Sequence, residues 1–147
     1  MIKTITVIVP VVKINEPFIL ERIYYPYMFY HIEVLIKGIL KETRKVKGYV
    51  AIDLVRGLTF MADSMPKTYK VSVDEKYIVP QQITLEQSEH LAKKKMVYVA
   101  MRKYKAIFPA TINVLSKKLA YKQFIIAKRE NKVVIIDTVT GEYEELK

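Results

Sequence analysis

Residues 50–57 read VAIDLVRG and residues 134–141 read VIIDTVTG, and the two octets agree at five of eight positions. Each octet is an apolar run that meets an aspartate and, four residues later, a glycine. A strand that ends in Asp-x-Val-x-Gly predicts a type I turn, which the glycine completes in the left-handed conformation of a G1-bulge hairpin. In such a turn the aspartate accepts backbone N–H hydrogen bonds.

Asp53 and Asp137 also have a functional interpretation. Paired across a pseudo-twofold axis, the two carboxylates would hold a cation or share a proton. We favour the structural interpretation, because a hairpin corner accounts for the aspartate and the glycine of each octet together. The octets then mark where each half of the chain turns.

The flanks of the octets follow a common order: an aromatic strand, a charged turn, an apolar strand and the corner. In the first half we expect strands at about 3–13, 18–37, 46–54 and 58–62. In the second half we expect strands at about 111–115, 119–128, 132–137 and 142–146. Pro26 cannot donate a ladder hydrogen bond, so we expect an interruption or bulge there. Residues 63–83 contain Pro66 and Pro80 and are expected to form a linker or a long loop.

One helix is predicted between the two halves. Thr84 followed by Gln87 is a capping-box pattern, and Pro109 ends the segment, so the helix should span about 84–107. The predicted fold class is therefore α+β: an antiparallel sheet from two weakly related β-hairpin halves, with one long amphipathic helix packed on it. We expect a single domain over 1–147, with the halves at about 1–62 and 110–147.

The composition excludes several classes of protein and site. The chain has 147 residues, of which 51% are hydrophobic, so it can bury a core without staples. It has no cysteine and only two histidines, which excludes disulfides, thiolate metal sites and a histidine-rich metal site. The apolar start, MIKTITVIVPVVKIN, is too short for a bilayer helix. We predict a cytoplasmic protein without a membrane span.

The positive charge is concentrated in one part of the chain. The formal net charge is +10, and residues 93–132 contain twelve Lys or Arg against one acid, Glu130. The other 107 residues carry thirteen bases and fourteen acids. A local basic surface is what an anionic partner requires.

Within this basic stretch the predicted helix has two faces. An apolar stripe is expected from Leu85, Ser88, Ala92, Met96, Val99, Ala100, Ala106 and Ile107. On the far side lie Lys94, Lys95, Tyr98, Arg102 and Lys105. Cations that flank an exposed ring suit a nucleic acid, since the cations meet phosphates and the ring stacks on a base. The alternative is a solvated face on which Tyr98 packs against lysine stems. Lys103 falls inside the apolar stripe and fits it poorly.

A second basic segment is the hairpin GILKETRKVKG, residues 38–48. It supplies the cations Lys41, Arg44, Lys45 and Lys47. A basic β-ribbon can track a nucleic-acid backbone, whereas the alternative is edge protection that keeps the strand soluble.

The aromatic run YYPYMFYH, Tyr24 to His31, predicts core packing or a dimer interface. On a strand, Tyr25, Tyr27 and Phe29 point to one side. A base-stacking sheet is the other possibility, although no RNP-type aromatic motif accompanies it. The segments TVIVPVV and VVII are apolar on both faces, which is typical of strands covered on both sides. We infer a homo-oligomer from this pattern.

No catalytic motif, metal site, cofactor site or small-molecule substrate is predicted. The chain has four glycines and lacks a phosphate loop, G-x-S-x-G and H-E-x-x-H. Among enzymes, the class that the sequence comes nearest to is a metal-dependent nuclease, through Glu130–Asn131–Lys132 or Asp74–Glu75–Lys76.

The leading hypothesis is a non-enzymatic protein that binds nucleic acid phosphates, with DNA and RNA both open. The rival is a protein–protein assembly module with a homodimer interface. A third hypothesis, an anionic membrane surface, is less favoured because the helix lacks Trp or Phe anchors on its apolar stripe.

Overall fold

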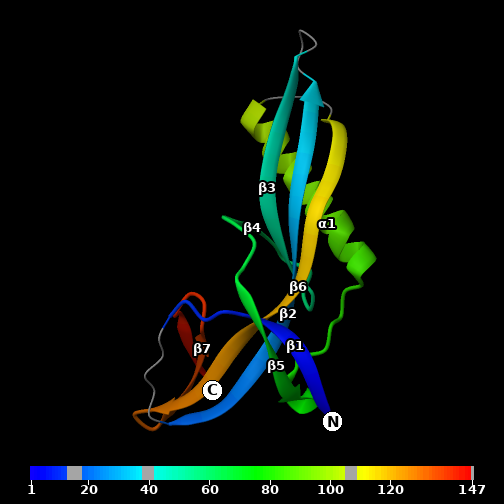
Figure 1. Ribbon diagram of the computed structural model, residues 1–147. Coiled ribbons are helices and arrows are strands. Elements are labelled where there is room, and N and C mark those ends of the chain that lie inside the picture. The colour runs from blue at the N-terminus through cyan, green and yellow to red at the C-terminus, as the bar shows by residue number, and fades with distance from the viewer. Residues whose placement is uncertain (13–17, 38–41, 105–108, 147) are drawn as a thin grey trace. The chain divides into compact units, whose positions relative to one another are not determined.

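The computed structural model describes residues 1–12, 18–37, 42–104 and 109–146 (Figure 1). In chain order the elements are β1 (Ile2–Ile8), β2 (Ile19–Lys37), β3 (Thr43–Asp53), β4 (Thr59–Ala62), β5 (Thr68–Asp74), the 3-10 helix η1 (Glu75–Tyr77), α1 (Leu85–Tyr104), β6 (Pro109–Arg129), β7 (Lys132–Asp137) and β8 (Tyr143–Leu146). The strand order is β4-β3-β2-β6-β1-β5, and β7 pairs with both β6 and β8. The predicted α+β class is confirmed.

Several details differ from the sequence-based expectations. The sheet is not wholly antiparallel, because β1 runs parallel to β6 with Val7 opposite Tyr121. These strands are far apart in the chain, so no tight turn fixes their relative direction. Residues 63–83 are not a plain loop, since they contain β5 and η1. The two strands expected between 111 and 128 form the single strand β6. Strand β2 continues through Pro26, and its ladder with β3 starts at Tyr27.

The chain forms two compact units, and each draws on both ends of the sequence. Unit 1 comprises residues 1–26, 66–80 and 120–147, and unit 2 comprises residues 27–65 and 81–119. The predicted halves, by contrast, were contiguous. The expectation of one single domain stays a prediction.

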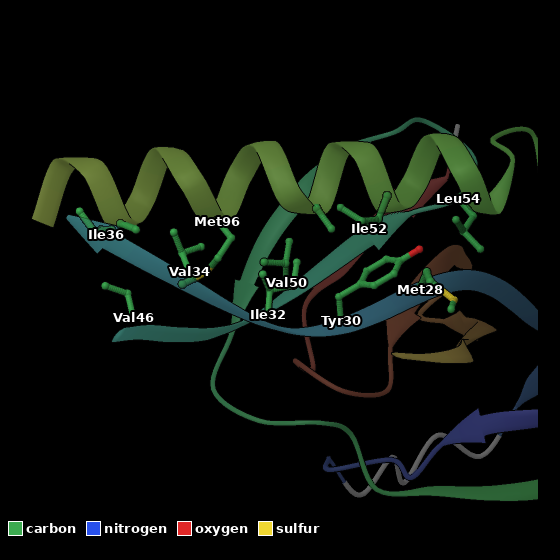
Figure 2. Packing of buried hydrophobic residues seen from close by; sticks show 12 residues of the cluster. Met28, Tyr30, Ile32, Val34, Ile36, Val46, Val50, Ile52, Leu54 and Met96 are labelled. Carbon is green, nitrogen blue, oxygen red and sulfur yellow. The ribbon is translucent and has the colours of Figure 1, made fainter. Parts of the chain in front are cut away.

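Unit 2 contains the helix and the larger core. Figure 1 shows α1 running along β3, β2 and the first part of β6, and Figure 2 shows the apolar side chains between helix and sheet. The buried positions of α1 are spaced by four residues: Ser88, Ala92, Met96 and Ala100. This confirms the middle of the predicted stripe. Leu85, also predicted there, is exposed, while Ala106 and Ile107 lie outside the described residues.

Small residues let the helix approach the sheet closely. A Cβ on Gly48 of β3 would lie 2.8 Å from the Met96 sulfur, so the glycine makes room for the methionine. Ala92 and Ala100 are fully buried on either side of Met96. Near the start of the helix, Figure 2 shows the Tyr30 hydroxyl pointing toward α1. That hydroxyl lies 2.5 Å from the Ser88 Oγ, so the two buried polar groups satisfy each other.

The start of α1 follows the predicted capping box. The Thr84 N–H donates to the Gln87 side-chain oxygen at 3.0 Å, and the Gln87 N–H donates to the Thr84 hydroxyl at 3.1 Å. Glu86 in the first turn and Arg102 with Lys103 in the last turn complement the helix dipole. These local interactions fix where the helix begins and therefore which residues face outward.

The two octets form corners of the same kind. The Asp53 carboxylate accepts the N–H groups of Val55 and Arg56 at 2.8 and 2.9 Å, and the Gly57 N–H donates to the Asp53 carbonyl at 2.8 Å. Gly57 has a φ of +77°. The turn therefore uses this aspartate as a hydrogen-bond acceptor for the backbone, as the sequence predicts.

The second corner repeats these bonds in unit 1. The Asp137 carboxylate accepts from Val139 and Thr140 at 2.8 and 3.2 Å, the Gly141 N–H donates to the Asp137 carbonyl at 2.8 Å, and Gly141 has a φ of +79°. Each corner links two antiparallel strands, β3 to β4 and β7 to β8. Each unit thus contains a three-stranded meander with one corner.

Unit 1 has two smaller apolar clusters. Ile125, Ala127, Val134 and Ile136 pack together between β6 and β7. Ile5, Val7 and Tyr24 form the other cluster, beside β5 and η1. Burial raises the pKa values of Tyr24 and Tyr121 above their ordinary value of 10.0, which favours the neutral phenol of each in the folded protein.

Candidate nucleic-acid interface

The outward side of α1 carries most of the predicted binding residues. Lys94, Tyr98 and Arg102 are exposed at successive i, i+4 positions, and Lys95 is half-buried. Tyr98 is 55% exposed, although the Arg102 guanidinium lies 5.8 Å from the centre of its ring and donates to its hydroxyl at 3.4 Å. The structure thus contains the predicted ridge, with the ring already contacted by one of its cations. Lys105 lies outside the described residues.

The cations of this helix differ in whether a carboxylate neutralises them. Lys93 lies 3.6 Å from the Glu89 carboxylate, one turn earlier. Lys94, Lys95, Arg102 and Lys103 have no acidic partner within 4.0 Å in the described part of the chain. Lys103, which the sequence pattern placed in the apolar stripe, is exposed. Its position in the last turn lets the long side chain leave the stripe and reach solvent.

The cations of the basic hairpin are only partly available to bind an anion. Lys45 and Lys47 are exposed on β3, but Lys47 lies 3.9 Å from the Glu33 carboxylate. Arg44 lies 3.6 Å from the exposed Glu42 carboxylate. The Arg44–Glu42 pair is exposed, and exposed pairs are worth only about 0–1 kcal/mol, so a stronger anion can displace this glutamate. Lys41 is outside the described residues.

Tyr104 brings the two basic segments together, and the sequence reasoning missed it. The Arg44 guanidinium of β3 lies 5.2 Å from the centre of the Tyr104 ring, and the Lys103 ammonium of α1 lies 5.5 Å from it. Cations hold such positions because the ring face carries negative charge. An aromatic residue among cations at the helix end was the available sequence signal, but the partner on β3 is 60 residues away.

The predicted interface residues fall in different units. Tyr25 belongs to unit 1 and makes an edge-to-face contact with Phe124, with ring centres 6.1 Å apart. Tyr27 and Phe29 belong to unit 2 and have ring centres 6.4 Å apart. Phe29 is only 9% exposed, so its ring is packed within unit 2 and offers little surface to a partner.

Local turns account for the acid–base triplets considered for a nuclease. Glu130 and Asn131 have φ values of +49° and +66°, and they form the two-residue loop between Arg129 and Lys132. Positive φ at both central positions is the signature of a type I′ hairpin. Asp74 caps η1 by accepting the Lys76 N–H at 3.1 Å.

The carboxylates of the two corners are likewise engaged in their own units. Asp53 bonds the turn of unit 2, whereas Asp137 bonds the turn of unit 1 and also accepts from Lys122 at 3.0 Å. Among the residues with described positions, no three His, Cys, Asp or Glu side chains come close enough to hold a metal ion.

Within the described residues, the protein has no helix that is long and apolar enough to cross a membrane. Comparison of the chain with protein-family models, curated proteins and solved structures finds no match in any of the three.

Proposed function

We propose that this chain is a non-enzymatic protein that binds nucleic acid through phosphate contacts on unit 2. The observation that carries the proposal is the meeting of two basic segments at the Tyr104 ring, with Arg44 from β3 and Lys103 from α1. A phosphate backbone that contacts the outward side of α1 would reach both segments. The contacts would be largely independent of sequence and sensitive to salt.

The distribution of charge between the units supports the same surface. Unit 2 contains 14 Lys or Arg residues and six Asp or Glu residues, whereas unit 1 contains 11 and nine. Most of the +10 net charge therefore belongs to the unit with the helix. Charge concentrated in this way raises the local potential and accelerates encounter with an anion.

The test is fluorescence anisotropy with labelled DNA and RNA at low and at moderate salt. We expect binding at low salt that weakens as salt rises. A variant with Lys94→Glu, Arg102→Glu and Arg44→Glu should lose binding, because it reverses three cations on the two segments. The matched control reverses three cations of unit 1, Lys3→Glu, Lys67→Glu and Lys70→Glu. Absence of binding by the native protein at low salt would refute the proposal.

A protein–protein assembly module remains the second candidate, and the edge strand β4 favours it. Its residues TFMA carry no charge, and Phe60 and Met61 are 47% and 42% exposed. Uncharged apolar edge strands are ready to pair with another chain. Sedimentation at several protein concentrations tests this candidate, and a homodimer should dissociate on Met61→Lys. A cytoplasmic location stays a prediction.

We also propose that the two meanders are related copies. The matching bonds at the two corners support this, as do the equivalent pairings Ile52 with Thr59 and Ile136 with Tyr143 that follow them.

A further inference from the structure

A stacked pair of rings lies on the sheet of unit 2. His31 of β2 and Tyr49 of β3 are direct cross-strand partners, and their ring centres are 4.3 Å apart with planes inclined by only 10°. The neighbouring positions Tyr30 and Val50 are buried in the core beneath α1. Because successive strand residues point to opposite faces, the two rings belong to the sheet face away from the helix.

The stack ends beside a small residue. The partner of Tyr49 on its other side is Ala62 of β4, which is the last strand of the sheet order at that end. A methyl group is too small to cover a phenol ring, and within the described residues the only ring stacked on Tyr49 is that of His31, on the opposite side from β4. Phe60, two residues before Ala62 and therefore on the same face, is exposed.

Polar groups lie next to the stack on the same face. Glu33 and Lys47 form the adjacent cross-strand pair, with the Lys47 ammonium 3.9 Å from the carboxylate. The Asn113 amide of β6 donates to the other Glu33 oxygen at 3.5 Å. Glu33 is only 9% exposed, yet both of its contacts are long, so the carboxylate retains capacity to accept a further hydrogen bond.

We propose that this face binds an unpaired nucleobase of a single-stranded nucleic acid, which stacks on Tyr49 above Ala62. The inference rests on the proposed function, since it names the form of nucleic acid that the basic unit would take. A flat ring on Tyr49 extends the existing two-ring stack, and Lys47, two residues before Tyr49 on the same strand and the same face, lies beside it. Bases of a duplex are already stacked on each other, whereas unpaired bases are free to stack on a protein ring.

The charge of the unit selects this ligand over an uncharged aromatic compound. Lys45 and Lys47 are exposed along β3 on the same face as the stack, where they can meet the phosphates that flank a base. The binding of a base by stacking does not depend on its identity, because every base has a flat face.

Two variants test the stack without altering the basic helix. Tyr49→Leu removes the ring, and Ala62→Leu keeps the ring but fills the space beside it. Tyr69→Leu is the matched control, because Tyr69 is also an exposed tyrosine on a strand but belongs to unit 1. Each is titrated by fluorescence anisotropy with a labelled single strand, the same sequence as a duplex, and an abasic single strand. Circular dichroism and urea unfolding confirm that each variant is folded.

We expect Tyr49→Leu and Ala62→Leu each to weaken binding of the single strand by about 5- to 150-fold, the usual contribution of one base–aromatic stack. Binding of the duplex and of the abasic strand should stay unchanged, as should all binding by Tyr69→Leu. If the native protein binds the base-bearing and abasic strands equally, the phosphate proposal stands and the stacking proposal is overturned. If it binds no nucleic acid at low salt, both fail. If Tyr49→Leu changes the sedimentation of the protein but not its affinity for the single strand, the face is an assembly interface and the stacking proposal is overturned.

Discussion

The dependence of binding on salt gives a quantitative test of the helix surface. Each phosphate that a cation neutralises contributes about −0.9 to the slope of log affinity against log salt on duplex DNA. On α1 the described cations without an acidic partner are Lys94, Lys95, Arg102 and Lys103. Four such contacts give a slope of about −3.6, a loss of roughly 150-fold in affinity between about 50 and 200 mM salt.

Neutralising two of these cations should halve the slope. For the double variant Lys94→Gln, Arg102→Gln, we expect a slope of about −1.8 and a loss of roughly 12-fold over the same salt range. Glutamine keeps much of the side-chain length and a good helix propensity, so the fold should be unaffected. The measurement is anisotropy of a labelled duplex at several salt concentrations.

Lys93→Gln is the matched control for this experiment. Lys93 lies on the same helix but is 3.6 Å from the Glu89 carboxylate, so its charge is already partly neutralised. Its replacement should change the slope by less than half of what each unpaired cation contributes. A slope that stays unchanged in the double variant, or that falls as far with Lys93→Gln alone, would show that phosphates do not meet this surface.

Three further predictions concern the fold that presents the surface. Gly57→Ala should lower the free energy of unfolding by about 1–2 kcal/mol in a urea titration, because a residue with a Cβ is strained at φ +77°. The new Cβ would also lie 2.7 Å from the Ile83 side chain. An unchanged free energy of unfolding would show that the corner is not as described. Met96→Ala should lower the free energy of unfolding by about 2–5 kcal/mol in the same titration, since it removes a fully buried side chain. A smaller decrease in the free energy of unfolding would mean that the helix is loosely packed. Burial raises the pKa of Tyr30 above its ordinary 10.0, while the Ser88 hydrogen bond lowers it and Glu89 raises it further. The stabilisation that the neutral phenol gives the fold is therefore complete below pH 10.0 and is lost as the pH rises through the higher pKa of the folded protein. Tyr30→Phe should lower the free energy of unfolding by about 1 kcal/mol at neutral pH and make its decline at alkaline pH shallower, and an equally steep decline would exclude this role.

The features predicted correctly from the sequence are those that depend on neighbouring residues. The capping box uses Thr84 and Gln87, which are three positions apart, and each hairpin corner lies within five consecutive residues. The helix cap and the hairpin corners are both determined by local hydrogen bonds, and the corners also by the positive φ that glycine allows. The four-residue spacing of Ser88, Ala92, Met96 and Ala100 is also local, and it correctly gave the face of α1 that is buried.

Features that depend on distant residues were missed. Nothing near Val7 or Tyr121 indicates that β1 runs parallel to β6, and the division into two interleaved units follows from pairings between distant strands. The same reason applies to the candidate site. Tyr104 falls inside the predicted helix but was not singled out, because its contact with Arg44 requires the hairpin to return beside the last turn of α1.

The contrast between the two units indicates where a ligand would bind. In unit 1 three cations sit close to an acid or a ring: Lys122 bonds Asp137 at the corner, Lys132 lies 3.6 Å from Glu145, and Arg129 lies 4.7 Å from the centre of the Tyr143 ring. Unit 2 carries 14 Lys or Arg against six Asp or Glu, whereas unit 1 carries 11 against nine, and on α1 the cations Lys94, Lys95, Arg102 and Lys103 have no acidic partner within 4.0 Å in the described part of the chain. Repulsion among like charges destabilises a fold unless an anion relieves it. Because unit 2 carries the larger excess of positive charge, it is expected to gain more stability from a polyanion than unit 1. A thermal shift upward with a single-stranded or duplex oligonucleotide, reduced in the Lys94→Gln, Arg102→Gln variant, is the observation that follows from this asymmetry.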